Sequence, residues 1–146
     1  MKNKGFTLIE LLIVIAIIGI LSSVVLSTLN TSRTKATNSK IQQQLANFRS
    51  GAEVYYNVQN PAGYSSAGDC TTGIFIETDS AQGQPGTYIA VANLPPGVSR
   101  VCGATVDAYA VKVSNADLTG YWCADSKNAL KMVNGAIGAS VTVCPP

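Results

Sequence analysis

The chain has 146 residues, of which 47% are hydrophobic and 12% are charged, and its formal net charge is +2. So few charges, together with a mean hydropathy of +0.22, are unusual for a soluble domain. After Gly5 the chain balances eight basic against eight acidic side chains, which argues against a basic nucleic-acid binder. It contains no histidine, which excludes triads, metal sites and pH switches built on histidine.

The chain begins with a short basic stretch and continues into a long apolar one. Lys2 and Lys4 precede residues 6–29, an almost unbroken apolar run of 24 residues. As a helix this run would be about 36 Å long, enough to cross a hydrocarbon layer of roughly 30 Å. A cleaved secretory signal is the competing interpretation, but no small-residue cleavage site follows the run. The sequence therefore predicts a transmembrane helix.

Glu10 is an acidic residue near the start of this apolar run. At mid-span such a group costs roughly 2.5–3.5 kcal/mol, and less near the interface. If the chain were cut before Phe6, the new α-amino group would lie one helical turn from Glu10, or level with it on a neighbouring chain, and would neutralise the carboxylate. The alternative is that Glu10 reaches the cytoplasmic interface and has no partner.

Residues 4–14, with the sequence KGFTLIELLIV, resemble the class III leader and N-terminal helix of type IV pilins and pseudopilins. The match continues to about Leu21. The resemblance implies that a membrane-embedded prepilin peptidase cuts between Gly5 and Phe6 and methylates the new Phe6 amine. It also implies that Glu10 docks an incoming subunit by meeting the Phe6 amine of a neighbour. Many pilins carry a proline some eight residues after the glycine matched by Gly19. Residues 3–60 of this chain contain no proline, so the sequence gives no reason to expect a fixed proline kink.

A polar stretch and then an amphipathic one follow the apolar run. Residues 30–40 are polar on all sides and rich in Ser, Thr and Asn, so a long helix would fray or hinge there first. Apolar residues then recur at spacings of three and four, which predicts a helical face covered by a sheet rather than by a partner helix: Ile41, Leu45, Phe48, Ala52 and Tyr55. Turn chemistry at residues 60–63 ends the helix.

Short strands separated by Gly, Pro, Asn and Asp are predicted downstream, at residues 74–76, 88–91, 109–113, 121–123 and 130–133. Residues 125–128 are predicted as the turn between the last two. In the third strand, Ala110, Lys112 and Ser114 are expected to face solvent. The expected fold class is α+β: a long N-terminal helix, transmembrane in its first half and amphipathic in its second, packed on a small antiparallel β-sheet head. Pilin heads have the same architecture.

Four cysteines, Cys70, Cys102, Cys123 and Cys144, follow the apolar segment without a C-x-x-C pair, which argues against zinc. An even number in a small exported domain favours two disulfides, and hence a head outside the cytoplasm with the N-terminus inside. We favour Cys70 with Cys102 and Cys123 with Cys144, because the second pair would fasten a C-terminal tail that has little apolar material. The resemblance also implies a C-terminal disulfide. The other two pairings stay open at this point.

The predicted organisation is a leader peptide (1–5), a transmembrane and fibre-core helix (6–29), an amphipathic helix (30–60) and a disulfide-stapled head (61–146). The resemblance implies a structural subunit that is a single-pass inner-membrane protein before assembly and is then incorporated into an extracellular homopolymer. Its implied partners are identical copies, the prepilin peptidase, the inner-membrane assembly platform and minor pilins. No phosphate loop, hydrolase elbow, metalloprotease motif or EF-hand spacing appears, so no enzyme activity, catalytic residue, cofactor, metal or specific nucleic acid is expected.

Two rival functions share these features. One is a pseudopilin of a type II secretion system or a minor pilin; Glu10 argues against the tip-capping pseudopilin, which lacks this residue. The other is a membrane-anchored binding subunit for DNA uptake or adhesion. Whether the fibre serves adhesion, motility, DNA uptake or secretion depends on motors and tip proteins encoded elsewhere.

Overall fold

The computed structural model of the chain describes residues 5–64, 69–117, 119–138 and 142–146, so most of the predicted leader lies outside the described residues. The helices are α1 (Leu8–Val58), the short 3₁₀ turns η1 (Gly73–Phe75) and η2 (Ser80–Gln82), and α2 (Pro85–Ile89). The strands are β1 (Arg100–Ala104), β2 (Tyr109–Ser114), β3 (Gly120–Asp125) and β4 (Leu130–Asn134). The chain forms two compact units, Met1–Lys35 and Ala36–Pro146, and α1 contributes to both.

In the first unit, α1 runs through Gly19 without a break and exposes apolar side chains along its length. Phe6, just before the helix, is 90% exposed, and the apolar side chains up to Leu29 are about half exposed or more. By length and composition this helix is apolar enough to cross a membrane, a test that a signal sequence near an N-terminus also passes. The predicted hinge at residues 30–40 is helical, and the boundary between the two units falls inside it.

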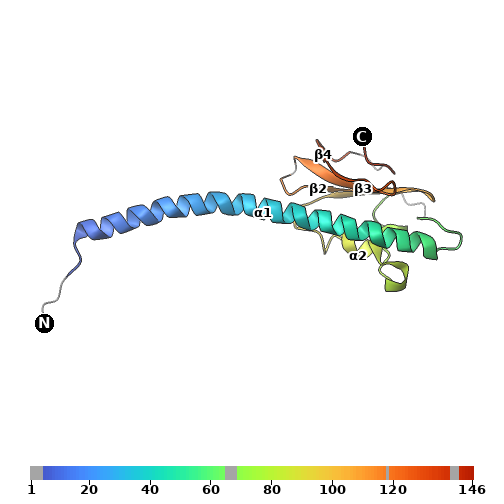
Figure 1. Cartoon of the computed structure of the whole chain (residues 1–146), viewed down its shortest axis with the longest axis horizontal. Helices are drawn as coiled ribbons and strands as arrows, with labels where there is room; N and C mark the ends of the chain where they lie inside the picture. The colour runs from blue at the N-terminus through green and yellow to red at the C-terminus, as the bar shows by residue number, and fades with distance from the viewer. Residues whose placement is uncertain (1–4, 65–68, 118, 139–141) are drawn as a thin grey trace. The chain divides into compact units, whose positions relative to one another are not determined.

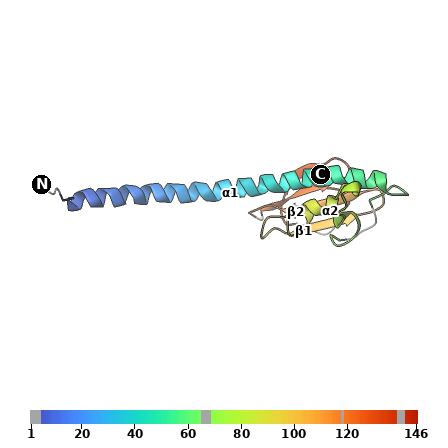
Figure 2. The same ribbon diagram turned by 90° about the horizontal axis from the view of Figure 1, so that it is seen from below.

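The second unit is built on an antiparallel sheet of order β1-β2-β3-β4, along which residues 36–58 of α1 lie (Figures 1 and 2). This confirms the α+β fold class. The predicted apolar face of the helix forms its core: Ile41, Leu45, Phe48 and Ala52 are fully buried, and Tyr55 is 7% exposed. The Phe48 ring packs edge-on against Tyr109 of β2 at a centroid distance of 5.3 Å. Burial of a large apolar side chain stabilises a fold by about 1.5–3 kcal/mol, so this face holds α1 on the sheet.

Three of the five predicted strands are confirmed. β2, β3 and β4 cover the predicted residues 109–113, 121–123 and 130–133, and the turn at residues 125–128 joins β3 to β4 as expected. Asn128 adopts a positive φ of 70° in that turn, a conformation that Asn tolerates better than most residues. β1 was not predicted; its pairing with β2, in which Cys102 lies opposite Val111, completes the sheet.

The other two predicted strands are wrong. Residues 74–76 overlap η1, and residues 88–91 overlap the end of α2, which starts at Pro85 because proline suits the first turn of a helix. The first turn of α2 packs closely on the end of the predicted strand at residues 74–76, since a Cβ at Gly86 would lie 2.5 Å from Ile76 C. Ile74, Phe75 and Ile89 are still buried in the core, which they reach from helical turns, whereas Ile76 and Val91 are exposed. A run of three or four apolar residues does not distinguish a strand from a turn of helix.

The outer face of β2 is also not the solvent face that its alternating pattern predicted. Lys112 and Ser114 are only 4% and 5% exposed, because this side of the sheet carries a second small core. That core unites Ala110, Tyr121, Cys123 and Cys144, so the C-terminal segment covers the sheet. The Lys112 ammonium lies 5.6 Å from the Tyr121 ring centroid, a cation–π distance, and burial lowers the pKa of Lys112.

Candidate functional site

The peptide bond between Gly5 and Phe6 lies in an exposed, non-helical stretch directly before α1. Helical hydrogen bonding begins after it, with Leu11 N donating to Thr7 O at 3.4 Å. A Cβ added to Gly5 would meet no described atom within 4 Å. Packing against the described residues therefore does not require glycine at this position, and both residues of the bond are exposed.

Thr7 and Glu10 form a capping box at the start of α1. Thr7 N donates to Glu10 Oε2 at 2.8 Å, and Glu10 N donates to Thr7 Oγ1 at 3.3 Å. The Thr7 hydroxyl also donates to Glu10 Oε2 at 2.7 Å. These reciprocal bonds satisfy two backbone N–H groups that a helix leaves without partners at its N-terminus. Glu10 thus starts the helix as well as carrying a charge.

The Glu10 carboxylate uses one of its two oxygens in this cap. Both bonds to Thr7 end on Oε2, and no bond to Oε1 is recorded among the described residues. In the uncut chain Phe6 carries a peptide amide rather than an amine, so the cationic partner expected from the sequence does not yet exist. Sequence reasoning missed the role of Thr7, although Thr7-Leu8-Ile9-Glu10 has the T-x-x-E spacing of a capping box.

The four cysteines form two disulfides in the second unit, Cys70–Cys102 and Cys123–Cys144, which is the favoured pairing. Cys123 lies on β3, and Cys144 belongs to the C-terminal segment on the outer face of the sheet. Asp125, at the end of β3, holds this segment with its carboxylate, a role that the sequence did not reveal because the bond spans 19 residues.

Acidic side chains in the described part of the second unit mostly organise their own turns. Asp69 accepts from Thr71 N at 2.9 Å and Asp117 from Thr119 N at 3.2 Å; both threonine hydroxyls add a bond and lower the pKa of these carboxyls. No group of three or more His, Cys, Asp and Glu side chains suited to a metal occurs among the residues that the structure describes.

Comparison with known proteins matches the same N-terminal segment. Residues 1–26 match the family model described as the prokaryotic N-terminal methylation motif. The chain is 28% identical to fimbrial protein Q of Moraxella bovis over 128 residues, covering 87% of this chain and 81% of that protein. It is 44% identical to fimbrial protein EcpB of Eikenella corrodens over 52 residues, 36% of this chain and 33% of that protein.

The family model covers the segment that holds Gly5, Phe6 and Glu10, and the similarity to fimbrial protein Q extends over the head. The structure adds the long apolar helix that continues onto a disulfide-bonded antiparallel sheet. The chain thus carries the prokaryotic N-terminal methylation motif and is similar to fimbrial protein Q over most of its length, which supports the resemblance to type IV pilins found in the sequence.

Proposed function

We propose that this chain is processed between Gly5 and Phe6 by a prepilin peptidase that also methylates Phe6, and is then built into an extracellular homopolymer. Before assembly it lies in the inner membrane with residues 6–29 as a single span, its N-terminus in the cytoplasm and its head outside. The two disulfides support this orientation, because such bonds persist in oxidising compartments.

In the fibre, we infer that Glu10 pairs with the Phe6 amine of a neighbouring copy. The observation that carries this proposal is the capping box, in which Oε2 binds Thr7 while Oε1 has no hydrogen bond to any described residue. A carboxylate offers about four lone-pair sites, so an amine can join without breaking the cap. Cutting before Phe6 creates that amine one residue from Thr7, at the level of the cap.

The pairing would also favour assembly over the membrane-inserted state. Exchanging lipid for neighbouring apolar helices yields little hydrophobic gain, because lipid tails are as apolar as leucine. A carboxylate near the hydrocarbon region, in contrast, is stabilised when a cation meets it in low dielectric. The polar pair therefore supplies register and part of the driving force, while the exposed apolar side chains supply packing.

Glu10→Gln tests the charge separately from the cap, because an amide can occupy the same position in a capping box. We expect normal membrane insertion and loss of sheared surface fibres in Glu10→Gln and in Glu10→Ala. Thr7→Val, which removes the cap hydroxyl but keeps the charge, is the matched control and should retain more fibre than either Glu10 variant. Fibre yield at the wild-type level in Glu10→Gln would refute the pairing.

Processing is tested at Gly5. Since the chain's own packing leaves room for a side chain there, a defect in Gly5→Val reports the peptidase site rather than misfolding. We expect the leader to stay attached, as measured by intact mass. A mature, methylated Phe6 terminus in this variant would rule out cleavage that depends on Gly5.

A further inference from the structure

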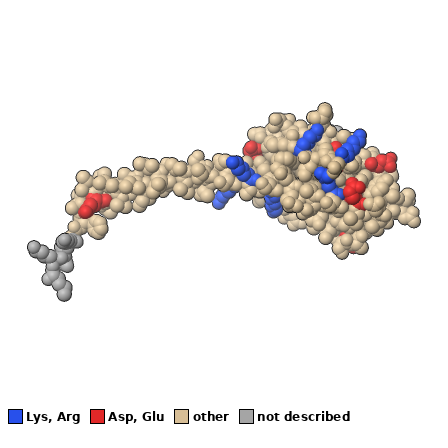
Figure 3. Space-filling model, in the orientation of Figure 1, with Lys and Arg blue, Asp and Glu red and all other residues tan. Residues whose placement is uncertain are grey.

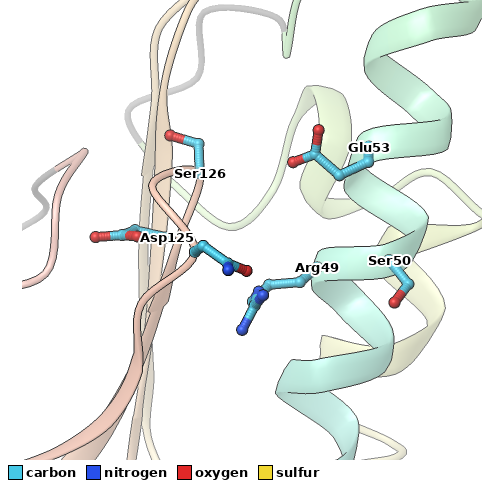
Figure 4. Close-up of a pocket in the computed structure, with 6 residues that line it drawn as sticks. Arg49, Ser50, Glu53, Asp125 and Ser126 are labelled. Atoms are coloured by element: carbon cyan, nitrogen blue, oxygen red, sulfur yellow. The ribbon is translucent and has the colours of Figure 1, made fainter.

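A polar cleft of about 280 Å³ lies in the head between α1 and the turn that joins β3 to β4. Three of its lining residues, Arg49, Ser50 and Glu53, come from α1, and three, Asp125, Ser126 and Asn128, come from the turn. In Figure 4, Arg49 and Glu53 project from the helix toward the turn, whereas the Asp125 side chain points away from the helix. The cleft is therefore open to a group that approaches Arg49.

Arg49 is half-buried and lacks a counter-ion in the part of the chain that the structure describes: no hydrogen bond or ion pair is recorded for its guanidinium there. The two nearby carboxylates accept hydrogen bonds from other groups, although the second oxygen of Glu53 has no bond among the described residues. Glu53 Oε1 accepts from the Tyr64 hydroxyl at 2.9 Å, and Asp125 accepts from backbone N–H groups. Arg49 thus presents a planar set of donors that matches a carboxylate and has no such partner within the described head.

The turn that faces Arg49 is rigidly held. Asp125 Oδ1 accepts from Lys127 N and Ala129 N, both at 3.0 Å, and Ser126 N donates to Tyr109 O at 3.1 Å. A cleft whose walls are fixed in advance loses little conformational entropy when it is filled. This distinguishes Arg49 from cations on open surfaces such as Lys127, where an ion pair contributes little.

Charge is distributed unevenly along the chain, in a way that suits contacts between copies. Residues 30–60 carry four basic and one acidic side chain, whereas residues 61–146 carry four basic and six acidic ones. Figure 3 shows basic side chains gathered in the middle of α1, and both acidic and basic ones on the visible face of the head. In a helical polymer two different faces of identical subunits meet, so the acidic head of one copy can contact the basic helix of the next.

Asp107 is the acidic residue of the head best suited to this contact. It is exposed in the turn between β1 and β2, and within the described residues no hydrogen bond or ion pair is recorded for it. The other described carboxylates of the head, those of Asp69, Glu77, Asp79, Asp117 and Asp125, each accept a bond inside the same chain. Asp107 therefore carries a charge that has no partner among the described residues of the same chain.

We propose that the Arg49 cleft receives Asp107 of a neighbouring copy in the fibre, so that this ion pair sets the axial register of the heads. The proposal rests on the assembly into a homopolymer proposed above. Tyr64 N donates to Val106 O, which places the Asp107 turn near the end of α1. Arg49 lies nine residues before that end, so the copy that supplies Asp107 would be displaced along the helix relative to the copy that supplies Arg49.

Charge reversal in the full-length chain tests the pair. Arg49→Glu alone and Asp107→Lys alone should each lower the yield of sheared fibres at least about tenfold, because each leaves a charge unpaired or opposed at every contact. The double variant should restore the yield. Lys127→Glu reverses a cation on the same turn that does not line the cleft, and it should leave the yield unchanged.

Two measurements check that each variant folds: the amount of the variant in the membrane fraction, and mass spectrometry showing that both disulfides have formed. If Arg49→Glu fails that check, Arg49→Gln takes its place, and Arg49→Lys should keep part of the yield. Normal fibres from either charge-reversal variant, or no rescue in the double variant, would overturn the pairing. If Glu10→Gln abolishes fibres while Arg49→Glu does not, this inference fails and the proposed function stands; normal fibres in Glu10→Gln refute the docking proposal independently.

Discussion

The backbone N–H of Cys144 donates a 2.8 Å hydrogen bond to Asp125 Oδ2, which ties the C-terminal segment to the end of β3. The same carboxylate accepts two bonds from the β3–β4 turn through Oδ1, and the side chain is only 2% exposed. One buried acidic group thus positions both the hairpin and the tail that covers the outer face of the sheet.

Asp125→Ala should be strongly destabilising. It removes the acceptor of three backbone donors, and losing charged hydrogen bonds at a buried site costs about 2–3 kcal/mol or more. The stability of Asp125→Asn should fall between that of the wild type and that of Asp125→Ala, since an amide keeps one acceptor oxygen. The free energy of unfolding, measured on the full chain in detergent, checks this order. Asp107→Ala, at an exposed carboxylate, should change it by less than about 0.5 kcal/mol, and an equal loss there would contradict the assignment.

Removing the hydroxyl group should lower the stability of the fold at one buried tyrosine, Tyr64, but not at another, Tyr109. The Tyr64 hydroxyl donates to Glu53, so Tyr64→Phe should cost about 1 kcal/mol of stability. The fully buried Tyr109 hydroxyl has no hydrogen-bond partner among the described residues, and Tyr109→Phe should be neutral or stabilising. Thermal denaturation of the two variants side by side gives the comparison. A clear loss in Tyr109→Phe would mean that its hydroxyl has a partner after all.

Gly51→Ala should destabilise the head, although Ala normally favours a helix over Gly by about 1 kcal/mol. The reason is that a Cβ at Gly51 would lie 2.4 Å from the Gly83 carbonyl oxygen, a backbone atom that cannot move aside alone. Overpacking of this kind costs about 1–3 kcal/mol. Gly19→Ala is the matched control, because a Cβ there meets no described atom within 4 Å. A gain in head stability from Gly51→Ala would contradict the close contact between the two backbones.

Removing either disulfide should destabilise the second unit by similar amounts. The bridges close loops with sequence separations of 32 and 21 residues, for which the chain-entropy model gives roughly 3–4 kcal/mol each. Replacing Cys123 and Cys144 by Ser should in addition expose the outer face, raising proteolysis of the C-terminal segment. Replacing Cys70 and Cys102 should leave that segment protected. Equal protease sensitivity in the two double variants would argue against a covering role for the tail.

The N-terminal segment, the long helix and the sheet residues of β2 to β4 could be predicted from the sequence because their signals are local. A run of apolar residues, the spacing of Ile41, Leu45 and Phe48, and the alternation after Tyr109 each reflect how neighbouring side chains meet water or a core. The short segments at residues 74–76 and 88–91 were assigned wrongly, because a few apolar residues specify burial but not backbone geometry.

Long-range contacts, in contrast, are decided only by the tertiary structure. Lys112 and Ser114 have the pattern of a solvent face, yet they are buried. On the same face, the C-terminal segment packs against Ala110 and Tyr121, and its position depends on a disulfide and on Asp125, which lies 19 residues from its partner Cys144. The Arg49 cleft likewise needs residues from α1 and from a turn that is distant in sequence. The amino-acid pattern alone thus predicted which residues are buried in a core and which are apolar enough to cross a membrane. Chain folding decided which polar groups meet, since hydrogen bonds between distant residues leave no periodic trace in the sequence.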